Sequence, residues 1–487
     1  MNKKVFIIGS GFSSLAASCY LAKMGYAVEV FEKNETIGGR ARRFTKDNFN
    51  FDMGPTWYWM PDVFEKFFSD FNKKVSDYYT LQKLSPAYKV YFDNENSIVI
   101  DDNLDDIAKT FESIEKNSGS KLQQFIANAK DNYNIAIKDL VYLPGDSPLE
   151  LVTFKTLFKI NQFFSTISKD VRKKIKDNRL RQILEFPVLF LGAKPSQTPS
   201  FYNFMNYADF GLGTWHPKNG MYSVIDAIKN IALEQGVLFH TNANVQEIVV
   251  QNSNVKGIIV NNEIKNCDIV LSGADYAFTE TLLPEKYRMY NLRYWNKKIF
   301  APSALLFYVA FSKKIENVAH HTLFFDVSFD EHSKAIYDKK EWPKEPLFYA
   351  SFPSVTDNFF APEGKESATF LIPIAPDLED NLEIREHYFN IIIKRLEKIT
   401  NQNVKDFVIF KESYCVNDFV KDYNSFKGNA YGLANTLLQT AFLRPKIKSN
   451  KVKNLYFTGQ LTVPGPGVPP SLISGKIAAD KIFNDNK

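Results

Sequence analysis

The chain opens with a strand, a glycine turn and a helix, and this order restricts the possible folds more than any other feature. Residues Lys4–Ile8 (KVFII) form a continuous apolar run typical of a buried parallel strand. The stretch "GSGFSSLAASCYLAKMGY" then predicts a turn followed by a helix that ends near Gly25, and "AVEVFEK" predicts a second strand. A strand, helix and strand in this order predict the start of a doubly wound α/β sheet.

The turn carries the residue types that a dinucleotide requires. Gly9 permits a tight turn, and Gly11 lets the backbone approach a pyrophosphate at the helix N-terminus. Ser14 occupies the third motif position, where it is small enough for close helix–strand packing. Glu32 follows about 20 residues later, at the end of the second strand, where an acid accepts hydrogen bonds from a ribose. The alternative role for Glu32 is an ordinary solvated acid at a strand end.

A second glycine pair separates flavin-binding from nicotinamide-binding chains. Gly38, Gly39 and Arg40 in "ETIGGRARRF" predict a loop that passes close to the dinucleotide, with Arg40 near its phosphates. Flavoproteins of the glutathione-reductase-like class need such a pair, whereas nicotinamide enzymes do not. The stretch "FDMGPTWYWMP" supplies Gly54, Pro55 and Thr56, after Asp52, for a tight loop beside a flavin ring.

The rest of the chain is divided by its patterns into five segments. We predict a cofactor domain from residues 1–70, 216–290 and 451–487, interrupted by an inserted region (71–215) and a substrate domain (291–450). A net charge of +5 is too weak to indicate nucleic acid as a partner. Three widely spaced cysteines provide neither a disulfide framework nor a zinc site, which favours a reducing cytoplasm, and we predict no metal. No uncharged run is long enough for a membrane-spanning helix.

The C-terminal stretch "NLYFTGQLTVPGPGVPPSLISGKIAADKI" completes a resemblance to a known family. With "GSGFSSLAASCYLAKMGYAVEVFEKNETIGGRARRF" and "FDMGPTWYWMP", it resembles the bacterial-type phytoene desaturases, which belong to the larger group of flavin-dependent amine oxidases and carotenoid desaturases. The resemblance extends over the whole chain, and "PGPGVP" followed by "SG" is its most particular part. It departs from the family pattern at Ser14, Gln460, Pro466 and Pro470.

The resemblance implies FAD as the cofactor and a glutathione-reductase-like fold with an inserted α+β substrate domain and a helical region that faces a membrane. It brings the terminal strand and helix back to the flavin, with Gly459, Gly465, Gly467 and Val468 against the ring system. Lys33 and Val245 complete the predicted cofactor contacts. The N–H groups at the start of this helix, near Val468–Ser471, would stabilise the reduced, anionic flavin. A proline-rich loop that only caps a packed helix is the alternative.

The resemblance also implies the chemistry, which is conversion of phytoene towards lycopene by successive removal of a hydride and a proton. FAD takes the hydride, and oxygen or a quinone is the expected electron acceptor. Glu150 is the candidate proton acceptor, with Asp146 as a second choice, although either acid also suits a helix N-terminus. The rival functions are desaturation of a later, hydroxylated carotenoid, oxidation of an amine, and non-catalytic transport of a prenyl lipid on the same fold.

A hydrocarbon substrate requires access to a membrane. Residues 155–181 are strongly basic and carry interleaved apolar residues in their first half, at Leu157, Phe158, Ile160, Phe163, Phe164 and Ile167. This pattern predicts an amphipathic surface segment for anionic lipid, and hence a peripheral protein on the cytoplasmic face of the cell membrane. A solvated helix face explains the same pattern. The sequence leaves the oligomeric state open.

Overall fold

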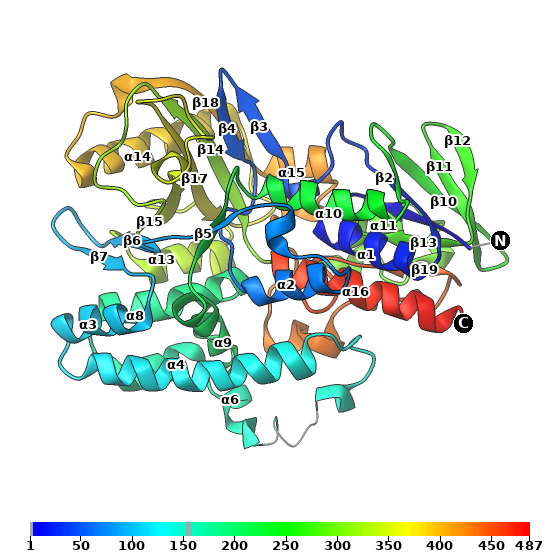
Figure 1. Cartoon of the computed structure of the whole chain (residues 1–487), viewed down its shortest axis with the longest axis horizontal. Helices are drawn as coiled ribbons and strands as arrows, with labels where there is room; N and C mark the ends of the chain where they lie inside the picture. The colour runs from blue at the N-terminus through cyan, green and yellow to red at the C-terminus, as the bar shows by residue number, and fades with distance from the viewer. Residues whose placement is uncertain (1–2, 152–155, 157) are drawn as a thin grey trace.

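The computed structural model describes residues 3–151, 156 and 158–487. Its first sheet has five parallel strands in the order β9 (Leu238–His240), β2 (Ala27–Phe31), β1 (Lys4–Ile8), β13 (Ile269–Ser272) and β19 (Leu455–Phe457). Segments from the start, middle and end of the chain therefore meet in one sheet. Both described ends of the chain lie at this side of the molecule (Figure 1).

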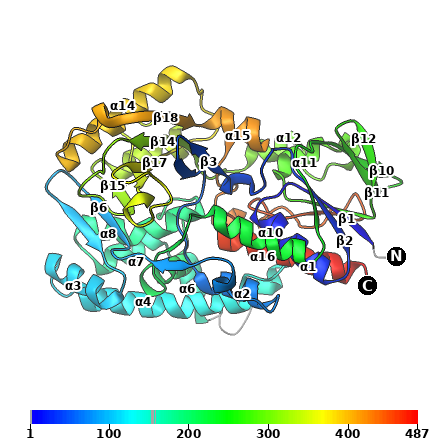
Figure 2. The ribbon, with the colours of Figure 1, turned by 45° about the horizontal axis from the view of Figure 1, so that its top comes forward.

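Three helices cover one face of the parallel sheet. They are α1 (Phe12–Lys23), α10 (Tyr222–Glu234) and α16 (Val468–Asp485), and α1 packs against both of the others (Figure 2). Helix α1 is buried on most sides because its small residues allow close approach. A Cβ at Gly475 of α16 would lie 2.3 Å from the Ser13 carbonyl oxygen, so the two helices meet backbone to backbone.

The opposite face differs from the doubly wound prediction, which expects helices on both faces. A three-stranded antiparallel sheet packs there, formed by β10 (Val245–Gln251), β11 (Asn254–Val260) and β12 (Glu263–Asn266). Ile248 and Ile258 share a buried cluster with Phe6 and Val270 of the parallel sheet, and α11 (Tyr276–Thr281) adds Tyr276 to it. The physical reason is that alternating apolar residues give a hairpin one buried face, which covers the sheet as well as a helix would.

A second, seven-stranded sheet forms the other half of the molecule. Its order is β18 (Val408–Tyr414), β14 (Ser303–Phe311), β17 (Glu366–Ile374), β16 (Phe348–Ser351), β15 (His321–Phe324), β6 (Tyr88–Tyr91) and β7 (Ser97–Ile100). Its neighbouring strands are antiparallel except β15 and β6, which run parallel with Thr322 opposite Lys89. The helix α14 (Leu382–Thr400) packs on it through Phe389 and Ile392. The segments predicted as 71–215 and 291–450 thus share one sheet, and the five-segment division itself stays a prediction.

Shorter elements connect and cover these sheets. Two antiparallel pairs join β3 (Arg43–Lys46) to β4 (Phe49–Asp52) and β5 (Leu81–Lys83) to β8 (Trp215–Pro217). A helical layer lies under the second sheet in Figure 1. It contains α3 (Leu104–Ile114), α4 (Ser118–Ile135), α6 (Ile160–Phe164), α7 (Ile167–Lys174), α8 (Asn178–Glu185) and α9 (Phe204–Asn206). The remaining named helices are α2 (Pro61–Ser69), α12 (Leu292–Lys297), α13 (Phe329–Lys334) and α15 (Val416–Tyr423). Across the described residues, no helix combines the length and the apolar character needed to cross a membrane.

Candidate functional site

A cavity of about 470 Å³ runs from the carboxyl ends of the parallel strands to the second sheet. One end is lined mainly by backbone and polar groups, and we call it the cofactor end. It includes Gly9, Gly11, Glu32, Lys33, Gly38, Gly39, Arg40, Gly54, Pro55, Thr56, Val245, Gly459, Gly467 and Val468. The other, which we call the apolar end, includes Trp57, Trp59, Phe186, Leu189, Phe190, Leu191, Met205, Phe325, Ile336 and Leu347. The structure therefore brings most of the predicted cofactor residues into one cavity.

The first turn leaves room at the start of α1. A Cβ at Gly11 would meet no atom within 4 Å, so this position opens directly onto the cavity. The second glycine loop lies against it, because a Cβ at Gly39 would be 3.1 Å from the Gly11 Cα. Gly54 is equally constrained, with its Cβ position 2.0 Å from the Arg40 carbonyl oxygen. Three glycines thus bring three backbone segments together, as a cradle for a pyrophosphate requires.

Glu32 lies at the end of β2 and is buried, with 4% of its surface exposed. One carboxylate oxygen accepts hydrogen bonds from the Ser10 N–H (3.1 Å) and hydroxyl (2.6 Å). The other accepts hydrogen bonds from the backbone and side-chain N–H groups of Asn34, both at 2.9 Å. These bonds hold the carboxylate at the cavity wall, in the position expected for a ribose-binding acid.

Arg40 is a partly buried cation at the cofactor end. Its Nη2 donates to the Ser425 hydroxyl (3.1 Å) and the Asn429 carbonyl oxygen (3.2 Å), whereas its Nε has no partner among the described residues. Burial lowers the pKa of this guanidinium, and the negative charge of Asp275 partly opposes that shift. A guanidinium with a buried, unused N–H group suits a phosphate, whose negative charge stabilises it.

Two of the predicted cofactor residues do not line the cavity. A Cβ at Gly465 would point at the Arg444 guanidinium (3.0 Å) and the side chain of Asn435, so Gly465 shapes the loop behind the cavity. The Ser14 hydroxyl is buried under Gly273, whose Cβ position lies 2.0 Å from the Ser14 Oγ. Ser14 therefore has the packing role that the third motif position predicts, and it does not contact the cavity.

The start of α16 is where the sequence predicts it, with Gly467 as N-cap and Val468 as first residue. Gly467 has φ 118°, which only glycine adopts without strain. This helix end has fewer free backbone N–H groups than the sequence predicts. Pro469 and Pro470 have none, and the Ser471 N–H donates to the Gly467 carbonyl oxygen at 3.0 Å. Val468 is thus the residue whose backbone N–H remains for an anionic ring at this helix end.

Glu150 lies away from the cavity lining and has a local role. Its carboxylate accepts hydrogen bonds from the backbone N–H groups of Gly145 (2.8 Å), Asp146 (3.0 Å) and Ser147 (3.3 Å). Asp146 forms an ion pair with Lys481 at 3.2 Å. The geometry favours the capping role for Glu150, and it does not support Glu150 as a proton acceptor.

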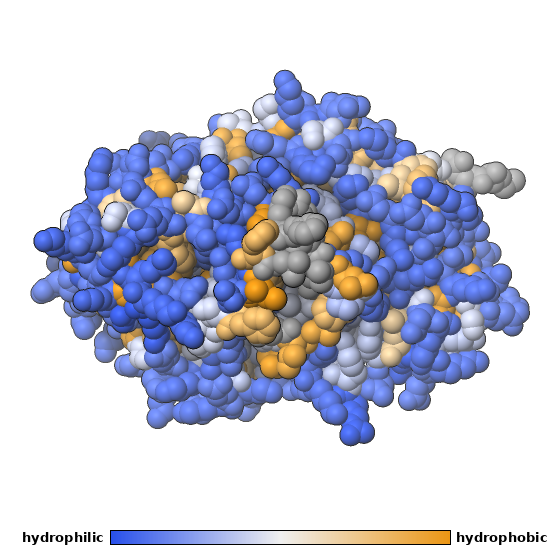
Figure 3. All heavy atoms as spheres, turned by 90° about the horizontal axis from the view of Figure 1, so that it is seen from below, coloured by the Kyte–Doolittle hydropathy of each residue, from blue (hydrophilic) through white to orange (hydrophobic). Residues whose placement is uncertain are grey.

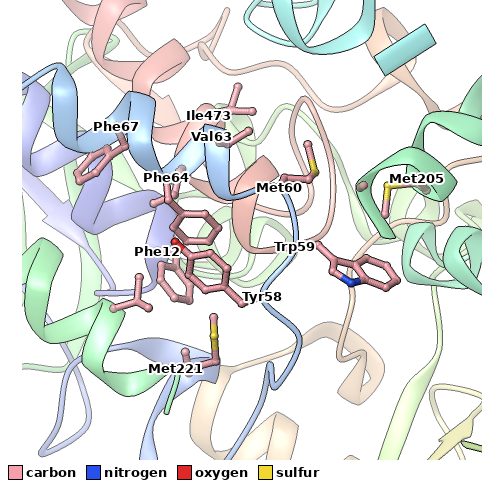
Figure 4. Close-up of a cluster of buried hydrophobic side chains, with 14 of the residues drawn as sticks. Phe12, Tyr58, Trp59, Met60, Val63, Phe64, Phe67, Met205, Met221 and Ile473 are labelled. Atoms are coloured by element: carbon pink, nitrogen blue, oxygen red, sulfur yellow. The ribbon is translucent and has the colours of Figure 1, made fainter. Parts of the chain in front are cut away.

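The segment Trp57–Met60 forms the wall between the two ends. Tyr58 stacks on Phe64 with ring centroids 4.1 Å apart and points into the protein core, whereas Trp59 points the other way, towards Met205 (Figure 4). Trp57 lies 4.0 Å from His321 and 5.6 Å from Phe186, measured between ring centroids. The sequence predicts this loop beside a flavin but indicates no role for its aromatic residues. Their alternation in "TWYWM" was the available signal, because side chains of an extended segment point to opposite sides.

The residues at the cofactor end fit FAD. The open position at Gly11, the buried carboxylate of Glu32 and the unused Nε of Arg40 suit a pyrophosphate and a ribose. When bound, FAD supplies the two-electron acceptor for a hydride. In the described part of the chain, no three His, Cys, Asp or Glu side chains are grouped to hold a metal ion.

Comparison with known proteins agrees with this fit. The family model for flavin containing amine oxidoreductase matches residues 12–483. A carotenoid 3,4-desaturase from Haloarcula japonica is 38% identical, with 99% of each chain covered. A zeta-carotene-forming phytoene desaturase from Myxococcus xanthus is 29% identical, over 99% of this chain and 94% of that protein. A 4,4'-diapophytoene desaturase from Staphylococcus haemolyticus is 30% identical, with 99% of each chain covered.

Solved structures share the fold. An oxidoreductase from Methanosarcina mazei superposes with a TM-score of 0.65 at 18% identity, over 97% of this chain and 99% of that one. Putrescine oxidase bound to putrescine gives a TM-score of 0.60 at 12% identity, with 99% of each chain covered. The glycine cradle, the full-length family match and the full-length relatives agree, and the chain belongs to the flavin-containing amine oxidoreductase family, alongside the carotenoid desaturases, with FAD as its cofactor.

Proposed function

We propose that this protein desaturates phytoene towards lycopene with FAD as the hydride acceptor. The apolar end of the cavity carries the proposal, because it offers aromatic and aliphatic side chains to a long hydrocarbon. A hydrocarbon has no polar groups to bind, so shape and apolar contact must orient it. The desaturase relatives described above support the same substrate class.

The distribution of charge in the cavity argues against an amine substrate. The carboxylates among the described lining residues are Glu32, Asp275 and Asp422, and all three lie with the cofactor-end residues. The apolar end has one histidine, His332, whose Nε2 lies 2.7 Å from the Pro373 carbonyl oxygen and whose Nδ1 accepts the Leu347 N–H at 2.7 Å. A protonated amine buried there would have no described carboxylate to pair with, which is costly.

The chain's own residues would prepare the reaction in three ways. The glycine cradle and Arg40 hold the dinucleotide, while Val468 at the helix end faces the cavity and favours negative charge on the ring. Trp57, Phe186 and Phe190 pack within 6 Å of one another by ring centroid and exclude water from the reacting carbons. The prediction that oxygen or a quinone reoxidises the flavin belongs to the same proposal.

A second candidate is desaturation of a later, hydroxylated carotenoid. The 38% identity to a carotenoid 3,4-desaturase favours it, because the phytoene- and diapophytoene-desaturase relatives described here are 29% and 30% identical. The two candidates differ in substrate and share the cofactor end of the cavity.

In the decisive experiment, the purified yellow protein is incubated with liposomes that contain either phytoene or a hydroxylated acyclic carotenoid. Oxygen or a quinone is supplied as the electron acceptor. We expect phytoene to be converted to longer-wavelength products that chromatography and absorbance identify. Conversion of the hydroxylated carotenoid alone would establish the second candidate. Binding of both lipids without any product would instead indicate a carrier.

We also propose that the protein binds the cytoplasmic face of the membrane through one apolar patch. Apolar side chains gather on the face seen from below (Figure 3). Highly exposed apolar residues of the neighbouring segments are Leu149 (76%), Phe158 (86%), Phe164 (81%) and Leu438 (80%). The Tyr202 and Thr440 hydroxyls are 2.7 Å apart, and Phe201, beside Tyr202, stacks on Phe163 at 4.7 Å, so the segments of Leu438 and Phe164 lie against the same stretch, Ser200–Asn203. Such a concentration of exposed apolar surface is typical of a binding site.

The apolar patch differs from the amphipathic segment that the sequence predicts. Ile167 is fully buried, and Phe163 stacks on Phe201 at 4.7 Å, so neither is free to enter lipid. Phe158 and Phe164 remain exposed, Ile160 is 48% exposed, and Leu157 lies outside the described residues. Exposed lysines of α7, Lys169, Lys173 and Lys174, lie nearby in the chain and suit anionic lipid headgroups.

A further inference from the structure

Three buried histidines form a row behind the cavity wall. His216 of β8 is 3% exposed, His320 is 4% exposed, and His321 of β15 is fully buried. Ring centroids are 4.6 Å apart from His216 to His320, and again from His320 to His321. We call these residues the histidine row. The functional site described above assigns them no role.

One end of the histidine row reaches the cavity through a tyrosine. The His321 Nδ1 lies 2.6 Å from the Tyr349 hydroxyl, which lies 2.8 Å from the Thr56 hydroxyl. Tyr349 and Thr56 both line the cavity. Thr56 belongs to the cofactor end, and the next residue, Trp57, begins the apolar end and stacks on His321 at 4.0 Å. The Tyr349 hydroxyl is therefore placed where the cofactor and a hydrocarbon would meet.

The other end of the row reaches a carboxylate near the surface. The His216 Nε2 lies 3.0 Å from Asp357 Oδ2, and Asp357 also accepts the N–H groups of Asn219 (2.7 Å) and Phe359 (3.1 Å). Val355 and Asn358, on either side of Asp357, are exposed. A polar cavity of about 10 Å³, roughly the space of one water molecule, is bounded by Thr56, His216, His320, Asp52, Ser351 and Thr369 among others. Polar groups thus continue from the main cavity to a surface loop.

Packing alone does not explain His321. Its Nε2 is buried with no hydrogen-bond partner among the described residues, an arrangement that disfavours the folded state. Burial, and next the positive charge that His216 can carry, hold the pKa of His321 well below its ordinary value, and burial raises the pKa of Tyr349. Both side chains are therefore uncharged at neutral pH, one as a proton acceptor and the other as a proton donor. Unsatisfied buried groups of this kind occur at catalytic sites.

Building on the proposed function, we propose that Tyr349 and His321 together accept the proton that each desaturation releases. Bound FAD would accept a hydride from one substrate carbon, and the proton on the neighbouring carbon would then be strongly acidic. That carbon gives a proton to the Tyr349 oxygen while Tyr349 passes its own proton to the His321 Nδ1. The electron pair of the broken C–H bond becomes the second bond of the new alkene. Tyr349 ends neutral, and His321 carries one positive charge.

The charges around the row suit this transfer. The titratable groups that face His321 and Tyr349 are His320, directly before β15, His216 on β8, Asp52 at the end of β4, Tyr431 and, through His216, Asp357. The carboxylates of Asp52 and Asp357 attract the arriving proton. A weak base is sufficient because loss of the hydride has already made the proton easy to remove. Tyr349 is the catalytic residue of the pair, and His321 acts through it.

The first test compares Tyr349→Phe and His321→Gln with Tyr308→Phe. Tyr308 is a buried tyrosine of the same sheet whose hydroxyl donates to the Met53 carbonyl oxygen at 2.8 Å, and it does not line the cavity. We expect kcat to fall by about a hundredfold or more in the first two variants, since acid–base groups contribute factors of that size. Flavin content and its visible spectrum should match wild type. Activity of Tyr349→Phe near that of Tyr308→Phe would overturn the proposal.

The pH profile adds a readout that a purely structural role would not change. His321 must be neutral to accept a proton, so activity should be lost only when the pH falls through its lowered pKa, below about 6.5. The pH–activity profile of His321→Gln should lack this fall in activity at low pH, and any fall in activity at high pH should remain. An unchanged fall at low pH in His321→Gln would assign that fall to another group and refute the role of His321.

A third readout needs no turnover. The chain has 6 His, so the imidazole nitrogens can be followed by NMR in ¹⁵N-histidine-labelled, FAD-loaded protein without carotenoid. Burial lowers the pKa of His320, His321 and His332, so we expect all three imidazoles to stay neutral at pH 6 and one of them to shift its Nδ1 signal in Tyr349→Phe. If no imidazole responds, the pair is not coupled. Wild-type protein that desaturates no carotenoid would refute the proposed function itself, whereas active wild type with an equally active Tyr349→Phe refutes this assignment alone.

Discussion

The two ends of the cavity are built in different ways. The cofactor end consists largely of backbone, held close by Gly9, Gly11, Gly39 and Gly54 within one short part of the chain, with α16 added from the C-terminus. The apolar end consists of side chains from segments far apart in sequence, from Trp57 to Leu347. A backbone site needs particular residues at fixed spacings, whereas an apolar surface accepts many residues that fill the same volume.

The largest effect is expected at Gly11, where this contrast is sharpest. Gly11→Val should give folded, soluble protein without flavin, because the backbone there has φ −72° and a new side chain meets only the open cavity. Absorbance at flavin wavelengths and a thermal melt would check this. Gly364→Asn, in a turn where a Cβ also meets nothing within 4 Å, is the control and should stay fully yellow. Full flavin occupancy in Gly11→Val would show that the pyrophosphate does not lie at this turn.

The sequence predicts the parts of the fold that depend on residues close together in the chain. The strand, turn and helix, the position of Glu32 and the start of α16 at Val468 all follow from short patterns, and the structure has them in place. Gly465 shows the limit, because a glycine that faces the cavity and one that faces Arg444 look alike in sequence.

The seven-stranded sheet could not be foreseen for a related reason. It depends on β6 pairing with β15, more than 200 residues apart, and nothing near Lys89 or Thr322 specifies that partner. The antiparallel sheet over the second face depends in the same way on contacts with Phe6 and Val270, which lie elsewhere in the chain. The Tyr349–His321 pair was missed because its members approach only through β15 and β16.

At the apolar end, a single larger side chain should block substrate and leave the cofactor untouched. Leu347→Trp adds a ring at a residue that lines the cavity. We expect carotenoid desaturation to fall at least about tenfold, since even one methylene in an apolar pocket changes discrimination by about tenfold or more. Flavin content should be unchanged.

The control for this prediction is Leu382→Trp, at a leucine that is 79% exposed at the start of α14. It should desaturate at the wild-type rate. Loss of flavin in Leu347→Trp would mean that the two ends of the cavity are not independent, and the contrast between them would fail.

The apolar patch on the outside of the molecule is a second surface that consists of side chains from separate segments. Replacing Phe158 and Phe164 with Ser should weaken binding to liposomes by at least about tenfold, because burial of roughly 60 Å² of apolar area, at about 25 cal/mol per Å², already corresponds to that factor. Sedimentation with vesicles measures this binding. The amount of FAD bound per protein should not change. Leu382→Ser removes a similarly exposed apolar residue elsewhere and should have no effect. Equal binding by the double variant and the control would exclude this patch as the membrane contact.

The smallest effect is expected at Ser14, where the sequence departs from its family pattern. Its hydroxyl is buried over Gly273 and has no partner among the described residues, whereas the hydroxyl of Ser18, one turn later, donates to the Leu15 carbonyl oxygen at 2.8 Å. Both residues are fully buried. Ser14→Ala should therefore raise the free energy of unfolding by up to about 1 kcal/mol, because it removes an unsatisfied group, and Ser18→Ala should lower it by a similar amount.

Urea unfolding of the flavin-free protein measures both changes, and flavin titration shows whether affinity follows. If Ser14 only packs the helix against the strand, Ser14→Ala should bind FAD as wild type does, since a methyl group occupies the same place over Gly273. Weaker FAD binding in Ser14→Ala alone would mean that the hydroxyl acts on the cofactor through the Gly9–Gly11 turn. The cofactor end would then depend on a side chain as well as on its glycines, and the contrast with the apolar end would be one of degree.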